Sequence, residues 1–339
     1  MSGYRVAVVG VTGAVGQELL HILEERNFPV AELKALASAR SVGREVEFRG
    51  EKVKVAEATP ESFAGVEIAF FSAGGGVSQT LVPEAVRRGA VCIDNTSAFR
   101  LDPEVPLVVP EVNPEDIKWH RGIIANPNCS TIIMVVALNP LHQAAKVKRV
   151  VVSTYQAVSG AGAQAMEVLR AQSRAVIEGR DFTPEILPYG KAPRHYQIAF
   201  NLLPQIDVFA EAGYTKEEWK MVHETQKIMH APEVKVTATT IRVPVFRCHS
   251  ESVNVEMERK LTVEEARRIL AAAPGVVVQD DPANMEYPMP AELSGRDEVF
   301  VGRVREDLTV DSGLNLWVVG DQIRKGAALN AIQIAERLG

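Results

Sequence analysis

The sequence predicts an α/β protein with two domains: a parallel sheet covered by helices on both faces, then an α+β domain with a mostly antiparallel sheet. Three observations support this. Short, continuously apolar strands alternate with helical patterns in the first third of the chain. After residue 129, polar and apolar residues alternate along longer β-rich segments. The 339 residues are also enough for two domains of roughly 150 residues each.

The first domain is predicted from apolar runs bounded by glycine and from 3.6-residue periodicity. The expected strands are 4–9, 33–37, 68–71 and 91–93, and the expected helices are 17–25 and 83–88.

The second domain is predicted from β-rich runs separated by helical stripes. The expected strands are 150–155, 234–245, 252–258 and two more within 299–319, and the expected helices are 132–138, 164–177 and about 325–338. We expect the last helix to return to the first domain. The predicted domains are therefore 1–128 with 322–339, and 129–321.

Composition excludes several classes of protein. Hydrophobic residues make up 46% and charged residues 24%, which is typical of globular proteins and not of disordered or fibrous ones. The net charge of −6 argues against a nucleic-acid-binding surface. No apolar run approaches the roughly 18 residues of a membrane span, and the N-terminus lacks the pattern of a signal peptide. Three cysteines cannot build a disulfide framework, so we expect a reducing, cytoplasmic location.

Three glycines at intervals of three residues, Gly10, Gly13 and Gly16, follow the first strand and open the first helix. Glycine lets the backbone approach a pyrophosphate, and a helix N-terminus offers free N–H groups. The spacing differs from the commoner G-x-G-x-x-G, so a purely structural turn is the alternative. The turn at 72–76 is a second place where bare backbone could contact the cofactor.

The end of the second strand indicates which dinucleotide binds. NAD enzymes usually carry an acidic residue there, whereas this chain has Ser38, Arg40 and Ser41. These side chains suit a 2′-phosphate, so we predict a Rossmann-type NADP-binding domain. The alternative is that Arg40 is an ordinary solvated loop residue.

Cys129 is the candidate nucleophile. It lies at the start of an apolar helix among Asn, Ser and Thr residues, where the helix dipole lowers the pKa of a thiol. Cys92, inside an apolar strand, is expected to be a buried core residue without a chemical role. Cys248 is also expected to be structural, because neighbouring strand residues face opposite ways and His249 would take the other face.

His249 is the candidate base, although spacing alone cannot choose among seven histidines. It lies in a β-rich segment that also holds Arg242. On one flat strand, residues seven apart would face opposite sides of the sheet. We expect a bulge or an edge at Pro244 to reset the register.

Four separated motifs together resemble aspartate-semialdehyde dehydrogenases, and the resemblance spans nearly the whole chain. The motifs are residues 97–100 (Ser-Ala-Phe-Arg), 126–131 (Asn-Pro-Asn-Cys-Ser-Thr), 155–160 (Tyr-Gln-Ala-Val-Ser-Gly) and 242–245 (Arg-Val-Pro-Val). The glycine spacing also agrees with this family.

The resemblance implies NADPH-dependent reduction of L-aspartyl 4-phosphate to L-aspartate 4-semialdehyde, a step in lysine, methionine and threonine biosynthesis. Cys129 would form an acyl-thioester. His249 would be the general acid/base, with a pKa near neutrality, and Gln156 would orient the substrate. It also implies a homodimer, with no metal ion.

The resemblance also assigns binding residues. Arg242 would hold the substrate carboxylate, Arg100 and Lys220 the phosphate, and Glu217 the ammonium. Without the resemblance, Glu217 and Lys220 are equally well explained as a surface ion pair on a helix. The expected cofactor contacts are Gly10, Thr12, Gly13, Ala14, Val15, Gly16, Ser38, Arg40, Ser41, Ser72, Ala73, Gly74, Asn95, Ser159, Gly160 and Gln322.

Three rival functions stay open. An N-acyl-γ-glutamyl-phosphate reductase would have no use for Glu217, because an acylated amine carries no positive charge. A thiol hydrolase or acyltransferase would not need the glycine turn and Arg40. An NADP-binding sensor would not need a nucleophile.

Overall fold

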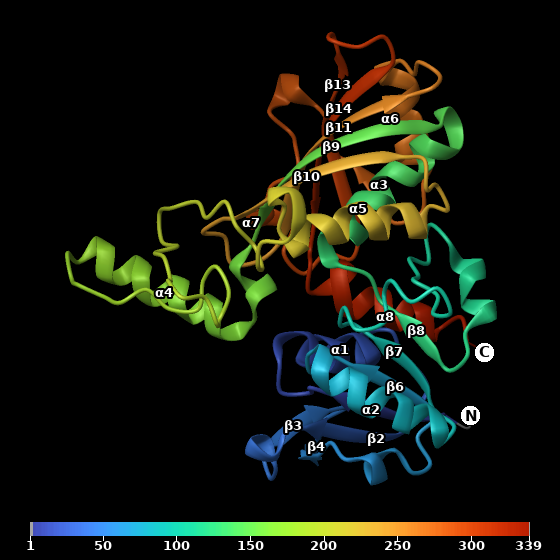
Figure 1. Cartoon of the computed structure of the whole chain (residues 1–339), viewed down its shortest axis with the longest axis vertical. Coiled ribbons are helices and arrows are strands. Elements are labelled where there is room, and N and C mark those ends of the chain that lie inside the picture. The colour runs from blue at the N-terminus through green and yellow to red at the C-terminus, as the bar shows by residue number, and fades with distance from the viewer. Residues whose placement is uncertain (1–2, 339) are drawn as a thin grey trace. The chain divides into compact units, whose positions relative to one another are not determined.

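The computed structural model describes residues 3–338, which form two compact units (Figure 1). The first unit comprises residues 3–128 and 326–338, and the second comprises residues 129–325. Residues 322–325 thus belong to the second unit. The helices of this described part of the chain include none long and apolar enough to cross a membrane.

The first unit contains a six-stranded sheet in the order β5-β2-β1-β6-β7-β8, with every neighbouring pair parallel. The strands are β1 (Tyr4–Val9), β2 (Val30–Ala37), β5 (Ala56–Glu57), β6 (Ile68–Phe71), β7 (Val91–Asp94) and β8 (Ile123–Ala125). A small hairpin, β3 (Glu45–Phe48) and β4 (Glu51–Lys54), lies outside it. The strand order reverses between β1 and β6, and such a switch point is where open α/β sheets bind ligands.

Helices cover both faces of this sheet. On one face, α1 (Ala14–Glu25) and α8 (Leu329–Ala335) share a core with the strands. On the other, α2 (Gly75–Arg87) packs through Leu81, Val82 and Ala85. Burial on both faces explains why the strands read as continuous apolar runs, and the predicted parallel α/β domain is confirmed.

The second unit contains a six-stranded mixed sheet in the order β10-β9-β11-β14-β13-β12. The three central pairings are antiparallel and the two outer pairings are parallel. Its strands are β9 (Val147–Gln156), β10 (Lys235–Arg242), β11 (His249–Met257), β12 (Val276–Val278), β13 (Val299–Asp307) and β14 (Gly313–Gly320). The predicted mostly antiparallel sheet is confirmed.

One face of this sheet is packed against three helices, α3 (Cys129–Ala145), α5 (Lys216–Ile228) and α6 (Val263–Ala271). Val152, Val253 and Leu316 lie side by side on that face and are at most 1% exposed. Burying each such side chain is worth about 1.5–3 kcal/mol. Two further helices, α4 (Ala163–Ile177) and α7 (Pro290–Leu293), belong to the same unit.

Element boundaries differ from the prediction where backbone chemistry intervenes. The expected strand 234–245 ends at Arg242, two residues before Pro244, which cannot donate to a ladder. The expected helix 325–338 is divided into a π-helical turn, Arg324–Ala328, and α8. The expected helix 83–88 begins much earlier, at Gly75, because Pro83 is tolerated inside α2.

Candidate active site

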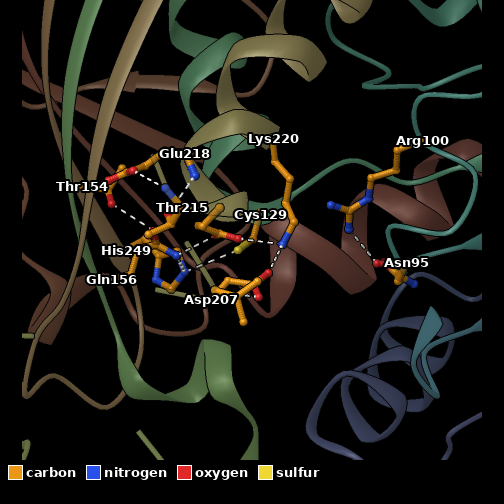
Figure 2. Close-up of polar contacts among 12 residues, drawn as sticks. Asn95, Arg100, Cys129, Thr154, Gln156, Asp207, Thr215, Glu218, Lys220 and His249 are labelled. Carbon is orange, nitrogen blue, oxygen red and sulfur yellow. Dashed lines mark hydrogen bonds and ion pairs between the residues drawn. The ribbon is translucent and has the colours of Figure 1, made fainter. Parts of the chain in front are cut away.

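Cys129 and His249 meet although 120 positions separate them in the sequence. Cys129 is the first residue of α3, as predicted, and its thiol is partly accessible. Its Sγ lies 3.4 Å from Nε2 of His249, the first residue of β11 (Figure 2). A sulfur at a helix N-terminus beside an imidazole is the arrangement that activates a thiol nucleophile.

Strand register brings two more predicted residues to the same place. Arg242, the last residue of β10, pairs with Gln156, the last residue of β9. On the other side of β9, Ser250 pairs with Tyr155, which puts His249 beside Gln156. The Gln156 amide nitrogen lies 3.4 Å from Nε2 of His249. Residues at one level of three neighbouring strands share a face of the sheet.

The expected bulge at Pro244 is therefore not the explanation for the spacing of Arg242 and His249. The two residues lie on different strands, and the chain turns back through residues 243–248 between them. This turn ends at Cys248, whose backbone is left-handed, with φ of 72°. The side chain of Cys248 packs with Leu293, Phe300 and Val319, away from the reacting sulfur.

The surroundings of His249 favour a neutral ring. The backbone N–H of Ala157 donates to Nδ1 at 3.1 Å, so the neutral ring carries its proton on Nε2, toward Cys129. Complete burial, together with the nearby Arg242 guanidinium, lowers the pKa of His249 to about 3, against an opposing effect of Glu217. The pKa of His249 thus lies below the value near neutrality expected from the sequence, because burial disfavours the imidazolium.

Glu217 and Lys220 lie in the first turns of α5 and face the same group of residues. Glu217 Oε2 lies 3.0 Å from Lys220 Nζ, and Oε1 accepts from the Gln156 amide at 3.1 Å. The Glu217 side chain is only 7% exposed. Glu217 is therefore buried, which excludes the alternative of a surface ion pair with Lys220.

A capping box fixes the start of α5. The Thr215 hydroxyl accepts from the backbone N–H of Glu218, and the Glu218 carboxylate accepts from the backbone N–H of Thr215. The other Glu218 oxygen accepts from the backbone N–H of Thr240 on β10 at 3.0 Å. Glu218 thus ties the helix to the sheet and orients Glu217 and Lys220.

Arg242 is a buried cation beside these groups. Its Nη1 donates to the Ala157 carbonyl at 2.7 Å, while Nε has no partner among the described residues. Burial lowers the pKa of Arg242, and the neighbouring Glu217 and Cys129 oppose that shift. A buried guanidinium with an unsatisfied donor is suited to an anionic ligand.

Three residues predicted to contact the cofactor lie around the histidine. A Cβ added to Gly160 would come within 2.8 Å of Arg242 Nη1 and 3.2 Å of His249 Cε1, so a side chain here would displace the guanidinium and press on the imidazole ring. The Gln322 amide donates to the Ser159 hydroxyl and accepts from the Cys248 backbone N–H. These contacts brace the segments on either side of His249.

A second buried acid, Glu251, lies near the site on β11, the strand that begins at His249. Glu251, two residues after His249, is fully buried, and neither carboxylate oxygen has a partner among the described residues. Burial raises the pKa of Glu251 well above its usual range. Its neighbour across the ladder is Thr154, whose hydroxyl donates to Gln156 at 2.9 Å.

Arg100 belongs to the first unit, where its guanidinium donates to two backbone carbonyls. Nε donates to Asn126 at 2.9 Å and Nη2 to Asn95 at 2.7 Å. Asn126 also donates to the Asn95 side chain and accepts from Asn330. Asn95, predicted to contact the cofactor, thus takes part in a hydrogen-bonded cluster at the end of β7.

A cavity of about 740 Å³ opens in the first unit beside the glycine turn. It contains seven of the predicted cofactor contacts: Gly10, Thr12, Gly13, Ser38, Arg40, Ser72 and Ala73. Glu57, Gly76 and Thr80 also line it and were not predicted. Six other predicted residues of this unit are not among its lining residues: Ala14, Val15, Gly16, Ser41, Gly74 and Asn95.

The glycines in and beside this cavity differ in what an added side chain would meet. A Cβ on Gly10 or Gly16 would lie within 2.5 Å of backbone oxygens, so internal packing alone requires glycine there. A Cβ on Gly75 or Gly76 would meet nothing within 4 Å. The N-terminal turns of α1 and α2 have no side-chain cap, and such turns bind phosphates well. The residues present therefore fit a dinucleotide.

The structure brings together six of the predicted catalytic and substrate residues in the second unit: Cys129, Gln156, Glu217, Lys220, Arg242 and His249. The sequence interpretation missed Thr154, Asp207 and Glu218. Of these, only Glu218 left a signal, because Thr215 followed three residues later by Glu is a capping-box pattern.

Comparison with known proteins identifies both units. Residues 5–120 match the family model described as "Semialdehyde dehydrogenase, NAD binding domain", and residues 138–325 match "Semialdehyde dehydrogenase, dimerisation domain". The first unit is thus an NAD(P)-binding domain.

Curated relatives match over the full chain. Aspartate-semialdehyde dehydrogenase of Bacillus subtilis is 56% identical, over 99% of this chain and 97% of the relative. The protein of the same name from Aquifex aeolicus is 58% identical, over 99% and 98%.

Solved structures agree with these relatives. Aspartate semialdehyde dehydrogenase II of Vibrio cholerae, solved in complex with ASA, has a TM-score of 0.93 and 46% identity, covering 100% of this chain and 98% of that one. The enzyme of Candida albicans, solved with NADP, has a TM-score of 0.75 and 26% identity, covering 99% and 98%. The family predicted from the four motifs is confirmed: the chain belongs to the aspartate-semialdehyde dehydrogenase family.

Proposed function

We propose that this enzyme reduces L-aspartyl 4-phosphate to L-aspartate 4-semialdehyde, releasing phosphate, through an acyl-thioester on Cys129. The names of its full-length relatives support this reaction, and so does the relative solved with ASA. The observation that carries the proposal is the 3.4 Å contact between Cys129 Sγ and His249 Nε2, surrounded by Gln156, Glu217 and Arg242.

In this mechanism, the Cys129 thiolate attacks the acyl carbon and the bond to phosphate breaks, leaving a thioester. The dinucleotide, when bound, supplies the hydride that reduces this thioester. The adduct then collapses to the aldehyde and returns the electron pair to sulfur. His249 holds its proton on Nε2, facing Cys129, and donates a hydrogen bond to sulfur and to the oxyanion that develops beside it.

The remaining side chains match the charges of the substrate. Arg242 offers a buried guanidinium to the carboxylate. Glu217 accepts the ammonium, and Lys220 neutralises the phosphate. The family resemblance gives Arg100 of the first unit a phosphate-binding role as well. Gln156, held between Thr154 and Glu217, orients the acyl group.

NADP is the proposed dinucleotide. Arg40 and Ser38 line the cavity beside the end of β2, and that strand end carries no acid. Glu57 of the neighbouring strand β5 lines the same cavity, so the ribose end holds one acid and one arginine. The relative solved with NADP favours the phosphorylated cofactor.

The second domain is also proposed to form a homodimer, because it matches the dimerisation domain of the family. One face of its sheet is packed against helices, while Ser252 and Trp317 on the other face are only partly buried. A cytoplasmic location stays a prediction.

The experiment that tests the function is phosphate-dependent reduction of NADP with L-aspartate 4-semialdehyde, run beside N-acetyl-glutamate 5-semialdehyde. We expect turnover with the aspartate compound alone. Glu217→Gln should weaken it strongly, because the neutral amide cannot pair with the ammonium. Preference for the acylated substrate would contradict the proposal, as would thioester turnover without any change in NADP.

A further inference from the structure

Lys220 is held by two carboxylates at once. Its Nζ lies 3.2 Å from Oδ2 of Asp207 (Figure 2). The same Nζ lies 3.0 Å from Oε2 of Glu217. The lysine side chain is 25% exposed and that of Asp207 34%, so the cluster is partly open to solvent. Asp207 comes from the loop before α5, far from every motif in the sequence.

Glu217 has partners other than Lys220 in the proposed reaction. Its other oxygen accepts from Gln156, and its carboxylate is the group that the proposed function assigns to the substrate ammonium. When that ammonium arrives, the lysine and the substrate compete for one buried acid. Asp207 still pairs with Lys220 at that stage, through Oδ2 at 3.2 Å.

The backbone around Asp207 is shaped to aim its carboxylate. Its φ is 67°, a left-handed conformation that Asp and Asn tolerate better than most residues. Oδ1 accepts from the backbone N–H of Val208 at 2.8 Å, and the Asp207 carbonyl accepts from the Gln205 amide at 3.1 Å. These bonds fix one carboxylate oxygen and leave the other directed at Lys220.

We propose that Asp207 is a positioning residue that keeps the Lys220 ammonium in the phosphate subsite while the ammonium of the substrate occupies Glu217. The inference rests on the proposed function and deepens it. Asp207 acts on the binding of the phosphate group, through Lys220, and does not contact the reacting carbon.

The test is the KM for inorganic phosphate in the NADP-reducing direction, at saturating aspartate semialdehyde, in Asp207→Asn. Asparagine keeps the left-handed backbone and an oxygen for Val208, but it loses the charge opposite Lys220. We expect the phosphate KM to rise about tenfold, as for loss of one charge-assisted hydrogen bond. The kcat and the KM for semialdehyde should change less than about twofold, a split that simple structural damage would not give.

Two further variants make the result decisive. Glu211→Gln, an exposed acid in the same loop, should leave all three constants unchanged. Asp207→Asn added to Lys220→Met should raise the phosphate KM no further, because the partner is gone. A phosphate KM that is unchanged or lower in Asp207→Asn overturns the proposal, and so does an equal rise in the Lys220→Met background.

The wild-type enzyme separates this proposal from the function beneath it. Absence of phosphate-dependent NADP reduction in the wild type overturns both. Normal wild-type activity with an unchanged Asp207→Asn phosphate KM overturns only the role of Asp207.

Discussion

The dinucleotide cavity of the first unit and the thiol cluster of the second are built in different ways. The cavity is largely backbone: the glycine turn and two helix N-termini without side-chain caps line it. The thiol cluster is made of side chains from α3, α5 and three strands. The first site should fail when atoms are added to it, and the second when atoms are removed.

The largest effect should come from Cys129→Ala. Removing the sulfur removes the thioester, so turnover should fall by at least about a thousandfold. Dinucleotide affinity, measured by fluorescence titration, should hardly change. Residual turnover above about a thousandth of wild type would contradict the role of this thiol. Alkylation should also select Cys129, because Cys92 and Cys248 are buried and burial raises the pKa of Cys248 to about 12.

Adding one methyl group at Gly16, beside the cavity, or at Gly76, which lines it, should have opposite effects on stability. In Gly16→Ala, the new Cβ would meet the Gly10 oxygen at 2.3 Å, and we expect a loss of about 3 kcal/mol in stability. In Gly76→Ala, the Cβ enters open space inside a helix, so stability should rise by about 0.5–1 kcal/mol while NADP affinity falls. Denaturant unfolding with NADP titration measures both. Equal stability losses would mean that packing explains every glycine.

Glu251→Gln should change how the stability of the second unit depends on pH. The folded-state pKa of Glu251 is raised, so the fold is most stable when this carboxyl is protonated. The free energy of unfolding is therefore highest below about pH 4.5 and falls as the pH rises. The amide does not titrate. Between pH 5 and pH 8, the variant should therefore gain stability relative to wild type. Parallel urea titrations at both pH values check this, and a constant difference would show that the carboxyl titrates normally.

The smallest effect concerns cofactor choice. Arg40→Glu should shift preference from NADP toward NAD by about tenfold or more, because a carboxylate repels the 2′-phosphate and accepts the ribose hydroxyl. The ratio of kcat/KM for the two dinucleotides measures it. Glu57→Gln is the matched variant on the neighbouring strand. If it moves the ratio more than Arg40→Glu does, Glu57 discriminates between the cofactors.

The difference between the sites also explains what the sequence could predict. The sequence alone was enough to predict the glycine turn from Gly10 to Gly16 and the nucleophile Cys129, because each motif is contiguous and lies at the start of a helix. The meeting of Gln156, Arg242 and His249 was implied by family resemblance but not by spacing, because it depends on the register of three strands. The neutral state of His249 could not be predicted either, since burial is a property of the folded chain. Asp207 and Glu57 have no motif at all.

The left-handed residue before β11 has a consequence for how the imidazole is held. Cys248 ends the return from β10, and His249 is the next residue. The face that His249 takes is fixed by the pairing of β11 with β9 and β14, and a slip of one residue along these ladders would point the imidazole to the opposite side of the sheet. The return itself is tied down, because the carbonyls of Val245 and Phe246 accept from the backbone N–H groups of Val158 and Ser159. Changes in this return should therefore reach the imidazole through the segment that follows β9.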